Sequence, residues 1–199
     1  MERAPVREYF NRDYYERFYH NRKTRIRDEK NIPMLADFIF SYLRRLHLPI
    51  RTILDVGCGL GEWRVALSKR YPKSRFQGIE YSNYLCRELG WKHGSAIDFK
   101  LSKTYDLVIC QSVLQYLTDH DAQRALRNLA RHCHGALYLE VVTKKDWHHH
   151  CDQRTTDDRI HLRSGMWYRN ELKSYFRTLG GGLFLAKKAS AVLWEMEEC

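Results

Sequence analysis

The sequence predicts an α/β protein with a single domain built around a mostly parallel sheet. Three observations lead to this prediction. The 199 residues suffice for one domain with a full core and little else. Short apolar runs typical of buried strands alternate along the chain with segments of helical periodicity, which is the pattern of βαβ units. After the first apolar run, Gly57, Gly59 and Gly61 indicate a tight strand-to-helix turn.

The composition narrows the class of protein. Hydrophobic residues make up 44% and charged residues 29%, as in ordinary globular proteins. No apolar run approaches the roughly 18 residues that span a bilayer, and residues 1–5 lack the apolar core of a signal peptide. We therefore expect a cytoplasmic protein that does not contact membranes. The six cysteines form no Cys-x-x-Cys pair, and we expect reduced thiols and no metal site.

The first 47 residues are expected to form an N-terminal helical cap. The spacing of Tyr14, Tyr15 and Tyr19 fits one face of a helix, and residues 33–47 have the periodicity of a second helix. The aromatic face either forms a lid over a ligand or packs on the core, and both interpretations stay open at this point. Much of the excess positive charge lies in the same part of the chain, in residues 22–27 and 44–45.

Residues 48–199 are expected to form the core, with a polar insertion at about 144–166. The predicted strands are 51–56, 75–80, 92–97, 105–110, 136–143, 182–188 and 191–197. The predicted helices are 61–70, 83–89, 119–132 and 167–179. Only a few residues around Ala189-Ser190 join the last two strands, so these two strands must be antiparallel. The result is a seven-stranded, mostly parallel sheet with an antiparallel last strand and helices on both faces.

The glycine turn predicts the position of a binding site. Ligands of open parallel sheets bind beyond the carboxyl ends of the strands, and the first strand ends at this turn. A dinucleotide site would require a third glycine at position 62, where the chain has Glu62. Glu62 and Asp55 place negative charge where a phosphate would lie. The turn therefore suits a ligand that lacks phosphates and has a cationic end.

The segment Asp55-Val56-Gly57-Cys58-Gly59-Leu60-Gly61 resembles motif I of the class I S-adenosylmethionine-dependent methyltransferases, and the chain looks like a small-molecule type of that family. The resemblance covers about residues 51–143. It implies a Rossmann-like fold, S-adenosyl-L-methionine as the cofactor and methyl transfer as the activity. It also implies that the glycine turn passes under the methionine part of the cofactor and that Asp55 helps to fix the ammonium group and the loop.

The resemblance implies further cofactor contacts along the chain. Glu80 would accept hydrogen bonds from the ribose hydroxyls, and Tyr81 would lie along the adenine ring. Asp98 would accept a hydrogen bond from the adenine amino group, with a backbone amide beside it contacting the ring, and Gln111 would lie near the methionine part. The implied cofactor-binding set is Asp55, Gly57, Cys58, Gly59, Gly61, Glu80, Tyr81, Asp98, Phe99 and Gln111.

Methyl transfer by in-line displacement requires alignment of donor and acceptor, and a base only if the acceptor is a hydroxyl or a protonated amine. The candidate catalytic residues are Tyr116, Glu140 and His161. Glu140 is a candidate because a carboxylate near the end of a buried strand requires an explanation. The candidate substrate-binding residues come from the N-terminal cap, the loop after the fourth strand and the polar insertion; they are Tyr15, Tyr19, Gln115, Arg163, Trp167 and Tyr168.

Other functions stay open at this stage. The net charge of +10 permits an RNA acceptor in place of a small molecule with a nitrogen or oxygen acceptor atom. A protein that binds the cofactor without turnover, as the partner of an active subunit, would keep the same cofactor residues. Glu62 argues against a nicotinamide oxidoreductase. The sequence defines neither the acceptor nor the oligomeric state.

Overall fold

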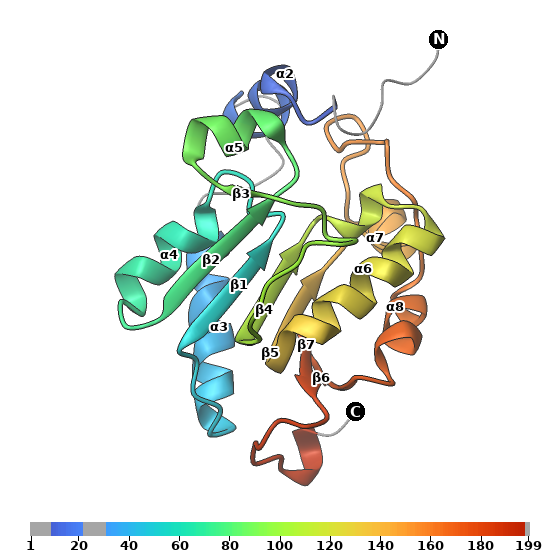
Figure 1. The fold of residues 1–199 in the computed structure, drawn as a ribbon. Helices are drawn as coiled ribbons and strands as arrows, with labels where there is room; N and C mark the ends of the chain where they lie inside the picture. The colour runs from blue at the N-terminus through green and yellow to red at the C-terminus, as the bar shows by residue number, and fades with distance from the viewer. Residues whose placement is uncertain (1–8, 22–30, 198–199) are drawn as a thin grey trace.

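A seven-stranded sheet organises the chain (Figure 1). The computed structural model describes residues 9–21 and 31–197, so the basic segment 22–27 lies outside the described residues. The order of the strands across the sheet is β3-β2-β1-β4-β5-β7-β6. The strands are β1 (Thr52–Val56), β2 (Arg75–Glu80), β3 (Lys92–His93), β4 (Tyr105–Gln111), β5 (Cys133–Glu140), β6 (Phe176–Gly180) and β7 (Leu183–Ala186).

Strand direction agrees with the prediction from the sequence. Neighbouring strands from β3 to β5 are parallel, whereas β7 is antiparallel to both β5 and β6. The carboxyl ends of the parallel strands therefore lie along one edge, where the glycine turn after β1 also lies. The helical elements are α2 (Arg12–Tyr15), the π-helical turn η1 (Glu16–His20), α3 (Asn31–Arg45), α4 (Glu62–Arg70), α5 (Asn83–Leu89), the 3₁₀ turn η2 (Leu114–Tyr116), α6 (Asp119–His132), α7 (Lys144–His149), α8 (Gly165–Leu172) and the 3₁₀ turn η3 (Glu195–Glu197).

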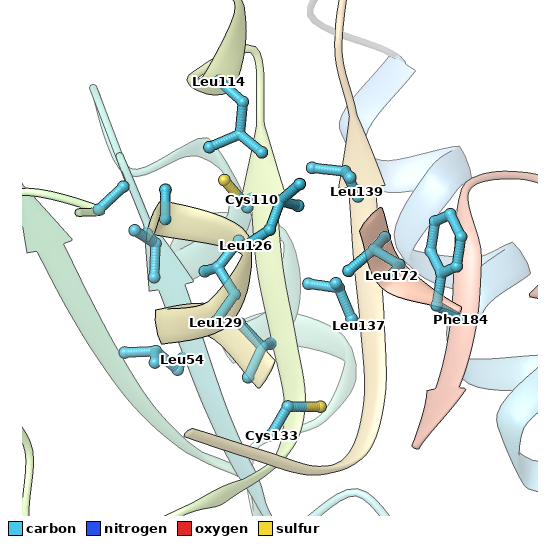
Figure 2. Close-up of a cluster of buried hydrophobic side chains, with 14 of the residues drawn as sticks. Leu54, Cys110, Leu114, Leu126, Leu129, Cys133, Leu137, Leu139, Leu172 and Phe184 are labelled. Atoms are coloured by element: carbon cyan, nitrogen blue, oxygen red, sulfur yellow. The ribbon is translucent and has the colours of Figure 1, made fainter. Parts of the chain in front are cut away.

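Helices cover both faces of the sheet because successive side chains of a strand point to opposite faces. On one face, α3 and α4 pack with residues such as Ile53 and Leu107. On the other face, α6 and α8 pack with the alternate residues Leu54 and Val108. Figure 2 shows the second cluster, where Leu126 and Leu129 of α6 lie against β4 and β5. No helix within the described ranges is long and apolar enough to cross a membrane.

The C-terminal part differs from the prediction. The expected helix 167–179 ends at Leu172, and its last residues form strand β6 instead. The expected strand 191–197 is not a strand: it pairs with no strand of the described residues, and Ala191 and Leu193 pack instead on the core cluster that contains α3. The antiparallel hairpin is therefore β6–β7. Its turn is the glycine run 180–182, in which all three residues have φ between 57° and 80°, a region that favours glycine.

Three strand boundaries were also wrong, one at β3 and two at β5. The strand expected over 92–97 stops at His93, because residues 95–99 form a turn in which the Ser95 carbonyl accepts from the amides of Asp98 and Phe99. Strand β5 begins at Cys133, directly after α6, and ends at Glu140. The insertion contains a short helix, α7, which begins with a capping box formed by Thr143 and Asp146.

Candidate functional site

A cavity of about 320 Å³ opens at the carboxyl ends of β1, β2 and β4. It is within the size range of small-molecule sites. Its walls come from the glycine turn, the ends of β2 and β4, the turn after β3, and the N-terminal segment. The lining residues are Phe10, Tyr14, Tyr15, Tyr19, Asp55, Gly57, Cys58, Gly59, Leu60, Glu62, Trp63, Glu80, Tyr81, Ser95, Ala96, Ile97, Gln111, Ser112, Val113, Tyr116, Leu117, Thr118, Asp121 and His161.

The turn requires glycine at all three positions, but not for the same structural reason. All have positive φ, at 76°, 52° and 80° for Gly57, Gly59 and Gly61. A Cβ atom at Gly57 would lie 2.2 Å from Val113 Cγ2, and one at Gly61 would lie 2.8 Å from the Trp91 ring. At Gly59 the nearest atom would be 4.0 Å away. Gly57 and Gly61 thus allow close packing within the protein, whereas Gly59 leaves bare peptide beneath open space in the cavity.

Glu80 connects the end of β2 to this turn. Its Oε2 accepts a hydrogen bond from the Gly59 amide at 2.8 Å, and its Oε1 accepts from the amides of Tyr81 and Ser82, both at 2.8 Å. The side chain is 5% exposed. Burial raises the pKa of Glu80 above its ordinary value, while the three amide donors oppose that shift. A buried carboxylate with an ordered position therefore lines the cavity beside the glycine turn.

Gln111, at the end of β4, is held in one orientation by its neighbours. Its Oε1 accepts from Trp63 Nε1 at 2.8 Å, and its Nε2 donates to Glu140 Oε1 at 3.0 Å. The hydroxyl of Tyr138 donates to the other carboxylate oxygen of Glu140 at 2.6 Å. Glu140 does not line the cavity. The structure thus places Glu140 behind Gln111, where it orients the amide.

The N-terminal segment closes one side of the cavity. Phe10, Tyr14, Tyr15 and Tyr19 contribute to the wall, and the Phe10 carbonyl accepts a hydrogen bond from Ser82 Oγ at 2.6 Å. Figure 1 shows α2 beside α5 at the carboxyl edge of the sheet. These aromatic rings pack together in a buried cluster with Leu85 and also line the cavity.

A second set of contacts joins this segment to the rest of the site. The hydroxyl groups of Tyr14 and Tyr116 lie 2.9 Å apart. Tyr9 donates to Asp157 Oδ1 at 2.8 Å, and the Arg159 guanidinium lies over the Tyr9 ring at 4.3 Å. Burial raises the pKa of Tyr14 and of Tyr116 well above the ordinary value of 10.0, so both phenols stay protonated near neutral pH.

The structure brings many of the predicted residues to the cavity. The cofactor candidates that line it are Asp55, Gly57, Cys58, Gly59, Glu80, Tyr81 and Gln111. Of the other candidates, Tyr15, Tyr19, Tyr116 and His161 line it as well. His161 is positioned by its backbone amide, which donates to the Gln115 carbonyl at 2.7 Å.

Other candidates lie elsewhere. Gly61 packs beneath Trp91. Asp98 is exposed outside the cavity, and Phe99 is buried in the core beneath α6. Ser95, Ala96 and Ile97 line the cavity instead, because the turn after β3 carries these residues past it. The prediction from the sequence looked for an acidic residue in this turn and chose Asp98, so it missed the small and apolar residues just before it. Trp63 was missed because it resembles an ordinary core residue of α4.

Four of the substrate candidates do not line the cavity. Gln115 is buried, 3% exposed. The Arg163 side chain is 4% exposed and donates to the Asp119 carboxylate, the Tyr168 hydroxyl and the carbonyls of Leu114 and Leu117. Its guanidinium also lies 5.0 Å from the centre of the Trp167 ring. These residues connect the insertion to η2 and α8.

This fold is the class I methyltransferase fold. DesVI from Streptomyces venezuelae has a TM-score of 0.63 to this chain at 17% identity, with 89% of this chain and 98% of DesVI covered. Magnesium protoporphyrin IX methyltransferase from Synechocystis, with bound S-adenosylhomocysteine, has a TM-score of 0.61 at 17% identity, covering 91% and 96%. At 17% identity, these similarities show the fold alone.

The sequence agrees with the fold. Residues 53–135 match the family model described as the methyltransferase domain. The chain therefore has the class I methyltransferase fold and, over residues 53–135, a match to the methyltransferase domain.

Two curated relatives extend the comparison. The chain is similar to trans-aconitate 2-methyltransferase of Deinococcus radiodurans, with 29% identity over 106 residues, which is 49% of this chain and 40% of the relative. Malonyl-[acyl-carrier protein] O-methyltransferase of Anoxybacillus flavithermus is 24% identical over 115 residues, 53% of this chain and 44% of the relative. The matches thus span less than half the length of these relatives.

Proposed function

We propose that this protein transfers a methyl group from S-adenosyl-L-methionine to a nitrogen or oxygen atom of a small-molecule acceptor. The observation that carries the proposal is the open space above Gly59, beside the buried carboxylate of Glu80. Bare peptide allows close approach of the amino-acid end of a ligand, and a fixed carboxylate can accept hydrogen bonds from ribose hydroxyls. A relative named for trans-aconitate supports a small acceptor, and a second relative is named for a malonyl group on an acyl carrier protein.

The residues of the cavity suit this cofactor. Asp55 and Glu62 provide negative charge near the glycine turn, where the cofactor's ammonium and sulfonium groups would be favoured over a phosphate. Tyr81 and the apolar residues Ala96 and Ile97 provide surfaces for an adenine ring. When bound, S-adenosyl-L-methionine supplies an electrophilic methyl group. We therefore assign Asp55, Gly57, Cys58, Gly59, Glu80, Tyr81 and Gln111 to cofactor binding, with Ser95, Ala96 and Ile97 added from the structure.

The acceptor would be bound between the N-terminal aromatic residues and the loop that carries His161. Tyr14 and Tyr116 stay protonated near neutral pH, so they act here as hydrogen-bonding walls that exclude water rather than as bases. His161 is the lining group that we assign to proton removal from a hydroxyl or ammonium acceptor. Glu140 acts as a positioning residue through its hydrogen bond to Gln111.

Calorimetry with S-adenosylhomocysteine and with NADH tests the cofactor. We expect binding of S-adenosylhomocysteine and no heat from NADH; the reverse result would overturn the cofactor assignment. A screen of small amines, phenols and carboxylic acids with labelled S-adenosylmethionine then tests turnover. Cofactor binding without any methylated product from this screen or from RNA would instead favour a non-catalytic partner subunit.

An RNA acceptor is the second candidate function. One observation favours it, namely a groove rich in arginine that adjoins the cavity. RNA should be included in the same transfer assay, and label incorporated into RNA but into no small molecule would replace the small-molecule proposal.

A further inference from the structure

A second hollow of about 630 Å³ lies between α6 and the turn after β3. Four exposed cations stand around it: Lys100 from the segment between β3 and β4, and Arg124, Arg127 and Arg131 from α6. We call this hollow the basic groove. Asp98 is the one acidic residue among the described residues that lines it. In Figure 1 the segment that follows β3 crosses the face of the sheet towards α6.

The floor of the basic groove is fixed by buried polar side chains. Asn128 is 3% exposed and its Nδ2 donates to the carbonyls of Ala96 and Phe99, both at 3.2 Å. His132 is 5% exposed; its Nδ1 lies 2.9 Å from the Asn128 carbonyl, and its Nε2 accepts from the Leu101 amide at 3.4 Å. These bonds attach the 96–101 segment to α6, so the groove has two connected walls.

Among the residues that the structure describes, three of the four rim cations have no acidic partner. Arg124 pairs with Asp121 at 3.3 Å. Within the described ranges, no carboxylate oxygen lies within 4.0 Å of Lys100, Arg127 or Arg131. Elsewhere on the surface, arginines such as Arg70 and Arg154 do have carboxylate partners, at 2.6 and 2.9 Å. The positive charge of the basic groove is therefore locally uncompensated, and an anionic ligand would gain from it.

We propose that the basic groove binds single-stranded RNA through its phosphates. Arginine is the residue best suited to phosphate because its planar guanidinium donates two parallel hydrogen bonds. The rise of an α-helix places Arg124 and Arg131 about 10 Å apart along α6, so the row can meet more than one charge of a continuous phosphodiester chain. A hollow with a row of arginines on one wall fits a flexible phosphodiester chain better than it fits the broad surface of a folded acidic protein.

The basic groove also adjoins the cofactor cavity. Ile97 lines both hollows, and Asp121 of the cavity wall lies one helical turn before Arg124. A strand bound along α6 would therefore pass the mouth of the cavity. The binding itself does not depend on methyl transfer, and no base-specific contact is implied because the exposed groups are cations. Binding that tolerates many sequences and weakens with salt follows from this arrangement.

Fluorescence anisotropy with a labelled oligouridylate of about twelve nucleotides tests the proposal at several salt concentrations. The groove variant is Arg127→Glu with Arg131→Glu. The matched control is Lys173→Glu with Lys188→Glu, two exposed lysines outside both hollows that give the same change in net charge. Affinity for S-adenosylhomocysteine and thermal unfolding are measured on every variant, so that loss of the fold or of the cofactor site is separated from loss of RNA binding.

The expected result is a loss of RNA affinity of at least about tenfold in the groove variant and at most about twofold in the control. The dependence of log affinity on log salt should become shallower by about 1.4 in the groove variant, for two lost phosphate contacts. Equal losses in both variants would overturn the proposal, because net charge alone would explain them. Absence of RNA binding to the unaltered protein, or tighter binding of polyglutamate than of RNA, would also overturn it.

Discussion

At the scale of single residues, the site depends on Gly59, which has no side chain, and on the buried carboxylate of Glu80 beside it. Gly59 leaves its peptide bare, and Glu80 accepts a hydrogen bond from the amide of the same residue. The shape of the turn and the position of the carboxylate are therefore coupled. A change at either residue should alter ligand affinity more than it alters the fold.

Gly59→Val should abolish binding of S-adenosylhomocysteine in calorimetry. The branched side chain would project into the open part of the cavity, and positive φ would add backbone strain. Gly90→Val is the control, since Gly90 also has positive φ and open space around it but does not line the cavity. The control should be less stable yet bind normally. Normal affinity in Gly59→Val would disprove the position of the ligand.

Glu80→Gln should weaken the binding of S-adenosylhomocysteine by about 1–3 kcal/mol, because a charged hydrogen-bond acceptor is lost. Glu88→Gln, on the exposed side of α5, should have no effect on this affinity.

The pH dependence of the affinity gives a second test of Glu80. Burial raises the pKa of Glu80 above 4.5, so affinity should be full above this raised pKa and should fall as protonation removes the acceptor. The acidic limb should thus begin above pH 4.5 and should be missing in Glu80→Gln; an identical limb in both proteins would contradict the assignment.

Several site residues could be predicted from the sequence because backbone geometry restricts them. A turn with repeated positive φ requires glycine, and an acid at the end of the second strand reaches the same edge as the first. The positions of Ile97 and Trp63 in the cavity wall could not be predicted, because an apolar residue of a cavity wall follows the same sequence pattern as an apolar residue of the core. Arg163 was assigned to the substrate, although its guanidinium is satisfied by groups of the protein itself.

At the scale of secondary-structure elements, buried polar side chains hold neighbouring segments together. Arg163→Met should lower the free energy of unfolding by about 2–4 kcal/mol, because it leaves the carbonyls of Leu114 and Leu117 without their donor. Arg169→Met, an exposed position on α8, is the control. Chemical denaturation measures both. A stable Arg163→Met protein with impaired acceptor binding would restore the original assignment of Arg163 to the substrate.

Asp106 connects β4 to the start of β1. It accepts from the amides of Arg51 and Thr52 and from the Thr52 hydroxyl, and His134 lies 2.9 Å from its other oxygen. Burial would raise the pKa of Asp106, but these hydrogen bonds outweigh burial and lower it below 3.8. This stabilisation is present above pH 3.8 and is lost as the pH falls through the lowered pKa.

Asp106→Asn should therefore reduce stability near neutral pH and should lose less of its remaining stability on acidification than the unaltered protein does. Denaturant unfolding between about pH 2 and pH 7 measures both effects. Asp37→Asn, at an exposed ion pair with Arg70, is the control and should change little. Parallel pH curves for Asp106→Asn and the unaltered protein would contradict this role.

The elements up to α6 could be predicted because apolar periodicity and turn residues agree there. In the C-terminal part the two signals conflict. Tyr168, Leu172 and Phe176 continue the four-residue spacing of a helix into a segment that forms β6, and pairing with β7 decides its structure. The three glycines at 180–182 do indicate the hairpin, yet the alternation of Val192, Trp194 and Met196 suggested a strand where no partner strand is available.

At the scale of the whole molecule, the N-terminal segment and the sheet form the cavity jointly. Binding of S-adenosylhomocysteine should therefore slow amide hydrogen exchange in residues 9–21, whose aromatic side chains line the cavity, while α8 should exchange as before. Saturation at about 100 times the dissociation constant should also stabilise the protein by about 2.7 kcal/mol. Protection confined to the glycine turn would show that the N-terminal segment does not contribute to the bound state.

The position of β7 has a consequence for synthesis. Among the described residues it is the last strand in sequence order, yet it lies between β5 and β6. While a ribosome is still making residues 183–186, the backbone groups of β5 that face β7 have no partner, and an exposed strand edge invites pairing with another nascent chain. The sheet closes only after residues 183–186 have been made, so premature termination shortly before Leu183 should yield polypeptides that aggregate and are degraded.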